Sequence, residues 1–164
     1  LSALVAAVQS AVTETGAEPP LFIKIAPDLT ETDIDDIAAV AISSGINGLI
    51  VSNTTIGRPN FLKGNHRAEN GGLSGKPLFA PSTKILSEMY KRCAGKLPLI
   101  GVGGISSGED AYRKIRSGAS LVQLYTALVY HGPRLITDIK RDLANFLKRD
   151  GFSTITDAIG VDVK

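Results

Sequence analysis

The strongest indication of the fold is the segment Pro98-Leu99-Ile100-Gly101-Val102-Gly103-Gly104-Ile105-Ser106-Ser107. Its first half is a short apolar run that predicts a buried strand. Gly103 and Gly104 then predict a tight turn, and Ser107 with Asp110 predicts the start of a helix. A strand that passes through a short turn into a helix is the βα unit of α/β proteins.

The same unit recurs along the chain. Further apolar runs rich in β-forming residues predict strands at 21–25, 48–51 and 119–124. Apolar residues at helical spacing predict helices over 1–12, 30–45 and 85–90, and a last one that starts near Pro133. The order is therefore one helix followed by four βα units. Continuously apolar strands predict a parallel sheet that is buried on both faces.

Two architectures fit this order, a doubly wound open sheet and half of a (β/α)8 barrel. A nucleotide-binding doubly wound sheet carries Gly-x-Gly-x-x-Gly after its first strand, whereas this chain carries Lys24-Ile25-Ala26-Pro27-Asp28. Barrels commonly bind phosphate at the loops after their last two strands, which end here in Gly103-Gly104 and Tyr125-Thr126. A whole barrel takes about 250 residues, so four units in 164 residues fit half of one.

Composition excludes several classes of protein. The chain is 43% hydrophobic and 21% charged, which excludes a disordered or collagen-like sequence. Its net charge of +2, with mixed signs, gives no indication of a nucleic-acid partner. No apolar run reaches the roughly 18 residues of a membrane span. Cys93 is the single cysteine and no metal-ligand spacing occurs, so we expect neither an internal disulfide nor a metal.

Glycines and hydroxyls at the last two strand ends predict a phosphate cup. Gly103 and Gly104 allow backbone N–H groups to approach an anion, with the following helix N-terminus behind them. Tyr125 and Thr126 end the neighbouring strand and would complete the cup. The alternative is a tight βα turn that merely needs a positive φ.

Three further segments are candidates for ligand binding. Lys24 lies within an apolar strand, which favours a ligand role over a lysine that snorkels to solvent. Ser52-Asn53-Thr54-Thr55 follows a strand and could hydrogen-bond a planar polar ligand, or could be ordinary turn chemistry. The long segment 53–78 contains Gly71-Gly72-Leu73-Ser74-Gly75-Lys76-Pro77-Leu78. Glycines at this spacing suit a backbone that passes close to a ring system, and the alternative is a flexible lid. Neither His66 nor His131 is favoured as a catalyst.

Taken in order, these motifs resemble the C-terminal half of the dihydroorotate dehydrogenase family. The resemblance rests on Lys-Ile-Ala-Pro-Asp at 24–28, Ser-Asn-Thr-Thr at 52–55, Gly-Gly-Leu-Ser-Gly-Lys-Pro-Leu at 71–78, Gly-Val-Gly-Gly at 101–104 and Leu-Val-Gln-Leu-Tyr-Thr-Ala-Leu at 121–128. The Gly-Gly-Leu-Ser-Gly form and the closing Thr156-Asp157-Ala158-Ile159-Gly160 resemble the quinone-dependent, mitochondrial-type class. The resemblance implies a (β/α)8 barrel, with residues 1–164 forming strands 5–8 and their helices as part of an FMN-binding domain.

The resemblance also implies a role for each candidate residue. Asn53 and Thr54 would bind the pyrimidine ring of dihydroorotate. The expected FMN contacts are Lys24 at the polar edge of the ring, Ser52, Ser74 and Gly75 along the flavin, and Gly103, Gly104, Tyr125 and Thr126 at its phosphate.

The implied reaction is oxidation of dihydroorotate to orotate in de novo pyrimidine (UMP) biosynthesis. A hydride passes to FMN, and electrons then pass to ubiquinone. The base of this class is a serine, which we expect before Leu1 because the chain opens within a helical pattern and reads as truncated. The residues before Leu1 would also carry the membrane-associating segment of a protein of the mitochondrial inner membrane. We therefore expect the chain alone to lack a catalytic base and to be inactive.

Two alternatives stay open at this point. One is the soluble class of the same family, which uses a cysteine base and other electron acceptors. The other is a non-catalytic flavin- or phosphate-binding half-barrel that pairs with itself. Any half-barrel leaves two sheet edges and one core face uncovered, so we expect poor solubility of the isolated chain.

Overall fold

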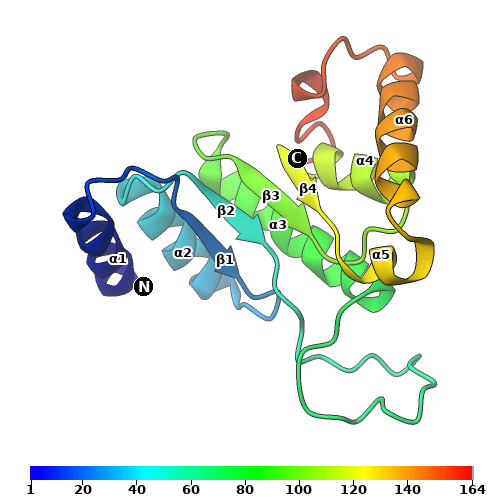
Figure 1. The fold of residues 1–164 in the computed structure, drawn as a ribbon, viewed down its shortest axis with the longest axis horizontal. Coiled ribbons are helices and arrows are strands. Elements are labelled where there is room, and N and C mark those ends of the chain that lie inside the picture. The colour runs from blue at the N-terminus through cyan, green and yellow to red at the C-terminus, as the bar shows by residue number, and fades with distance from the viewer. Residues whose placement is uncertain (164) are drawn as a thin grey trace.

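A computed structural model describes residues 1–163 and contains a four-stranded parallel sheet in the order β1-β2-β3-β4 (Figure 1). The strands are β1 (Phe22–Ile25), β2 (Gly48–Val51), β3 (Leu99–Val102) and β4 (Leu121–Gln123). Neighbouring strands in the sheet are also neighbours in the chain, as in the wall of a barrel. A doubly wound sheet instead reverses its strand order at a switch point. The barrel-type architecture expected from the sequence is therefore the one found.

The helices alternate with these strands. They are α1 (Ser2–Glu14), α2 (Glu31–Ser43), α3 (Phe79–Cys93), α4 (Gly108–Arg116), α5 (Thr126–His131) and α6 (Arg134–Arg149), with short 3₁₀ turns η1 (Lys76–Leu78) and η2 (Thr156–Ala158). The sequence does not predict α5, since this helix follows β4 almost at once and spans too few residues to show a helical period. The start of α2 has the expected cap, because Thr30 and Asp33 bond reciprocally to each other's backbone N–H.

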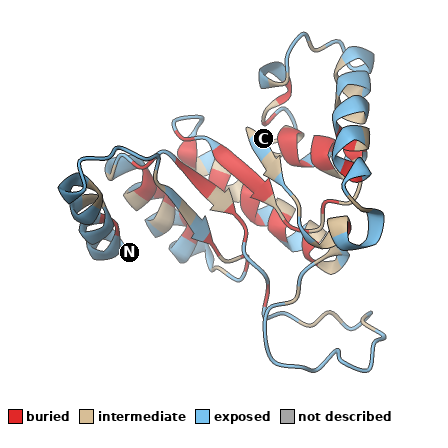
Figure 2. Cartoon of the chain, in the orientation of Figure 1, coloured by how far each residue is buried: buried red, intermediate tan, exposed pale blue. Residues whose placement is uncertain are grey.

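The main core lies between the sheet and the helices α2, α3 and α4, which cover one face (Figures 1 and 2). Leu49 of β2 and Leu99 of β3 are fully buried there, together with Leu86 and Met89 of α3. Cys93 is also fully buried, and burial raises the pKa of its thiol. The central strands and the middle helix thus form the rigid centre on which the strand ends are held.

The opposite face of the sheet is open at its two edge strands. Phe22 of β1 is 36% exposed and Leu121 of β4 is 61% exposed, and Lys24 is exposed as well. The expectation that every strand is buried on both faces is therefore wrong for β1 and β4, because helices cover one side only. The uncovered face expected of a half-barrel is present.

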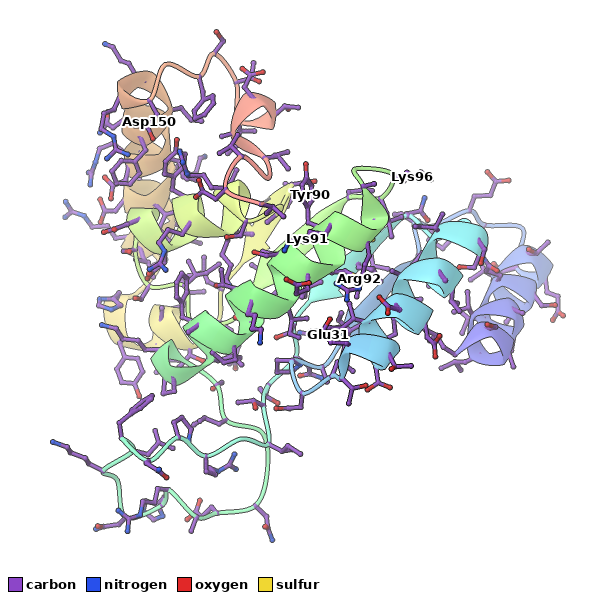
Figure 3. The ribbon with its side chains drawn as sticks, turned by 180° about the vertical axis from the view of Figure 1, so that it is seen from behind. Glu31, Tyr90, Lys91, Arg92, Lys96 and Asp150 are labelled. Atoms are coloured by element: carbon purple, nitrogen blue, oxygen red, sulfur yellow. The ribbon has the colours of Figure 1, made fainter. Side chains whose placement is uncertain are left out.

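Arg92 on α3 ties this helix to α2. Its guanidinium lies 2.6 Å from a carboxylate oxygen of Glu31 (Figure 3). It also contacts Asp35 and lies 2.8 Å from a carboxylate oxygen of Glu88. These hydrogen bonds raise the pKa of Arg92 further above its usual range, and the Arg92 bond in turn lowers the pKa of Glu88. A network of this kind fixes the helix pair more firmly than an isolated surface ion pair would.

The C-terminal tail packs back onto the body of the molecule. The backbone N–H of Gly160 donates to the carbonyl of Ile115 at 3.1 Å. Gly160 has a φ of +72°, and a Cβ there would lie 2.1 Å from the ring of Tyr90 on α3. Only glycine lets the tail approach Tyr90 this closely, so the tail position depends on this contact.

We expect Gly160→Ala to destabilise the protein by about 1–3 kcal/mol, because the added methyl collides with Tyr90 and occupies an unfavourable φ. Gly151→Ala is the matched control, since Gly151 also has a positive φ (+77°) but a methyl group there would meet no atom within 4 Å. Urea unfolding of both variants measures the difference. Equal losses in the two variants would contradict the role given to the Tyr90 contact.

Candidate functional site

A pocket of about 420 Å³ opens at the carboxyl ends of the four strands. This is the edge at which barrel enzymes bind their ligands. Every site residue expected from the sequence lines it, namely Lys24, Ser52, Asn53, Thr54, Ser74, Gly75, Gly103, Gly104, Tyr125 and Thr126. Residues from four separate strand ends and from the long loop are thus brought together.

Lys24 enters the pocket from β1. It pairs with Ile50 in the register of β1 and β2, on the uncovered face of the sheet. Its side chain is exposed, which differs from the buried position that the apolar strand suggested. The ammonium is consequently open to a ligand in the pocket.

The segment after β2 is held by backbone bonds to both neighbouring strands. The N–H of Ser52 donates to the carbonyl of Val102 at 3.3 Å, and the N–H of Asn53 donates to that of Ile25 at 2.7 Å. Ser52 is 1% exposed, and its hydroxyl donates to the Asn53 carbonyl at 2.9 Å. Asn53 and Thr54 are exposed into the pocket, so their polar groups can meet a ligand.

The long loop is folded back on itself and is not an open lid. Thr55 and Leu73 form an antiparallel bridge, with backbone bonds of 3.1 and 2.7 Å. The guanidinium of Arg58 donates to the carbonyls of Glu69 at 2.8 Å and Gly71 at 2.7 Å. These contacts return Ser74 and Gly75 to the pocket.

Asp28 anchors the start of this loop. Its carboxylate accepts hydrogen bonds from the Thr55 hydroxyl and, at 3.0 Å, from the N–H of Ile56. Asp28 therefore shapes the loop after β2.

The turn after β3 requires its glycines. Gly103 and Gly104 have φ values of +107° and +74°. A Cβ on Gly104 would lie 2.5 Å from the Cβ of Phe79, and one on Gly103 would lie 2.7 Å from the hydroxyl of Ser82. The turn therefore packs directly on the start of α3 while its other side lines the pocket.

The first turn of α4 offers fewer free backbone N–H donors to an anion than its position after the glycine turn suggested. The carboxylate of Asp110 accepts from both the N–H and the hydroxyl of Ser106, each at 2.9 Å. The N–H of Asp110 donates to the Ser107 hydroxyl at 3.1 Å. The helix thus binds the Ser106 amide with its own cap, which leaves the glycine turn as the better source of backbone donors.

On the far side, the end of β4 meets the loop. The Thr126 hydroxyl donates to the Ser74 hydroxyl at 3.1 Å, and Tyr125 is 82% exposed at the pocket mouth. The contact joins the segment after β4 to the long loop, and both line the pocket.

Four polar or aromatic lining residues are ones that the sequence does not predict as site residues: Lys76, Ser106, Tyr130 and His131. Lys76 belongs to the Gly-Gly-Leu-Ser-Gly-Lys-Pro-Leu motif, which is the available signal. His131 is not favoured as a catalyst by the sequence, and it reaches the pocket because α5 ends there.

The pocket is suited to binding a planar polar ligand that carries an anion. Lys24 and Lys76 supply positive charge, and amide, hydroxyl and glycine backbone groups supply hydrogen bonds. Within residues 1–163, no three His, Cys, Asp or Glu side chains gather closely enough to hold a metal ion. None of the helices described is long and apolar enough to cross a membrane.

Comparisons with known proteins point to one family. A family model described as dihydroorotate dehydrogenase matches residues 1–147. Dihydroorotate dehydrogenase (quinone) of Azorhizobium caulinodans is 50% identical over all of this chain and 47% of its own length. The mitochondrial dihydroorotate dehydrogenase (quinone) of Oryza sativa subsp. japonica is 60% identical over 89% of this chain and 31% of its own.

The fold agrees as well. A crystal structure of the Eimeria tenella enzyme in complex with ferulenol superposes with a TM-score of 0.93 at 43% identity, covering 98% of this chain and 47% of that one. The chain thus spans about half the length, or less, of the relatives that it matches. The family match over most of the chain and the high identity to several relatives lead to one conclusion: the chain belongs to the dihydroorotate dehydrogenase family.

Proposed function

We propose that residues 1–164 form part of an FMN-binding (β/α)8 domain that oxidises dihydroorotate to orotate in de novo UMP synthesis. The observation that carries this proposal is the pocket at the strand ends, which gathers all the residues expected to bind cofactor and substrate. Its volume of about 420 Å³ is in the usual range for a small-molecule site.

The residues present fit FMN. Gly103 and Gly104, where a Cβ would not fit, line the same pocket as Tyr125 and Thr126, and these four residues would hold the phosphate. Lys24 would lie at the polar edge of the ring, with Ser52, Ser74 and Gly75 along it. Bound FMN would supply the hydride acceptor, and the Lys24 cation would stabilise the negative charge that reduction adds.

The substrate would lie beside Asn53 and Thr54. A carboxamide and a hydroxyl can pair with the alternating donors and acceptors of a dihydropyrimidine ring. Both side chains start from the backbone segment that is fixed to Ile25 and Val102, which gives them a defined position.

We place the proton-abstracting base and the membrane-associating segment outside residues 1–164. Relatives of this chain are two to three times as long, which leaves room for both. We further propose ubiquinone as the electron acceptor and the mitochondrial inner membrane as the location. The names of the plant and mouse relatives support this location, while other similar relatives are bacterial.

Purification of the full gene product tests the proposal. We expect a yellow protein with stoichiometric FMN that reduces a ubiquinone analogue with dihydroorotate, measured as orotate absorbance. Activity only with soluble acceptors would point to the soluble class. A dimeric flavoprotein that is inert with dihydroorotate would indicate the self-pairing half-barrel, and a colourless protein would contradict the proposal.

Lys24→Met in the full gene product should keep FMN bound but lower the reduction potential of the flavin. Loss of the cation disfavours the anionic reduced form, and a shift of ~30 mV corresponds to about 1.4 kcal/mol for two electrons. Dihydroorotate should then reduce the flavin more slowly. Lys84→Met, an exposed lysine outside the pocket, is the control. An unchanged reduction potential in Lys24→Met would mean that Lys24 does not stabilise the reduced flavin.

A further inference from the structure

A buried lysine lies directly behind the glycine turn. Lys114 of α4 is 0% exposed, although lysine is rarely buried without an ionic partner. Its ammonium donates to the Ser82 hydroxyl at 2.6 Å and to the Val102 carbonyl at 3.4 Å. It also lies 5.1 Å from the centre of the Phe79 ring. Both hydrogen-bond partners are neutral, so neither of them neutralises the charge.

The charged groups facing Lys114 are few. On its own helix, Asp110 favours its charged form and Arg113 opposes it. The Asp110 carboxylate is already bound to Ser106. The partners from α3 and β3, Ser82 and Val102, carry no charge. Desolvation is the largest effect and lowers the pKa of Lys114 to about 7.

The contacts of Lys114 lead to the pocket wall. Val102 lines the pocket, and Ser82 bonds to the carbonyls of Leu78 at 2.7 Å and Gly103 at 3.3 Å, which line it too. One layer of backbone therefore separates the ammonium from the space in front of Gly103 and Gly104. A charge this deeply buried is screened little by salt or water, so it acts across that layer.

We propose that Lys114 supplies the buried positive charge that stabilises a phosphate group bound at the Gly103-Gly104 turn. This inference rests on the proposed function, because it assumes that the cup holds the phosphate of FMN. Lys114 acts through the turn and does not contact the ligand, so it is a positioning and electrostatic residue. The phosphate would in turn provide the counter-charge that the neutral shell of Lys114 lacks.

FMN and riboflavin differ only in the phosphate group. Comparing their binding therefore distinguishes an electrostatic role of Lys114 from a structural one. We would measure binding of FMN and of riboflavin to the apo form of the full gene product, in the wild type and in Lys114→Met. The expected result is a loss of FMN affinity on the order of tenfold or more, with riboflavin affinity unchanged. Lys140→Met removes the same charge from the exposed face of α6 and should change neither affinity.

Equal affinity of Lys114→Met and wild type for FMN would overturn the proposal. Equal losses for FMN and riboflavin would also overturn it, because they would mean that Lys114 only shapes the pocket. A wild type that binds neither ligand would instead refute the proposed function, so the two failures are distinguishable.

A measurement on the wild type covers the case in which Lys114→Met does not fold. At pH 8 the free phosphate of FMN is already a dianion, since its second pKa is about 6. Lys114, with a pKa of about 7, is then mostly neutral, and a bound dianion would raise that pKa. Calorimetry in buffers of different ionisation enthalpy should detect proton uptake with FMN and none with riboflavin. No uptake with FMN would contradict the proposal.

Discussion

The close packing of the Gly103-Gly104 turn on the start of α3 is the constraint on which the site depends. A methyl on either glycine would meet Phe79 or Ser82 at less than 3 Å. Because β3 and α3 belong to the fully buried centre of the molecule, this contact fixes the position of the turn at the end of β3. The other walls of the pocket, Asn53 from β2 and Thr126 after β4, are then placed relative to it by strand pairing and by the loop.

An open sheet face and a pocket that gathers all the expected site residues exist together in this chain. The helices bury one face, while Phe22, Lys24 and Leu121 stay accessible on the other. In a closed barrel that face would point to the interior, where inward side chains fill the core. Lys24 would then become an interior cation at the ligand, which explains why an apolar strand carries it.

Much of the fold and the site could be predicted because local signals agreed. The strand runs and the caps at Thr30 and Ser107 matched the observed elements. Two features of the fold could not be predicted. Helix α5 is too short to show a helical period in the sequence, and the exposure of β1 depends on which helices cover it. In the sequence, Lys114 cannot be distinguished from an ordinary exposed lysine of a helix. It is buried only because α4 packs on β3 and α3.

In the proposed function, the Gly103-Gly104 turn forms the phosphate end of a flavin site. Flavin content of Gly104→Ala, measured by visible absorbance of the purified full gene product, tests it most directly. Gly95→Ala is the control, because Gly95 has a similar φ of +73° in open space, whereas a Cβ on Gly104 meets Phe79. We expect Gly104→Ala to lose its flavin and Gly95→Ala to keep it. Full flavin content in a folded Gly104→Ala variant would mean that the turn does not hold the phosphate of the flavin.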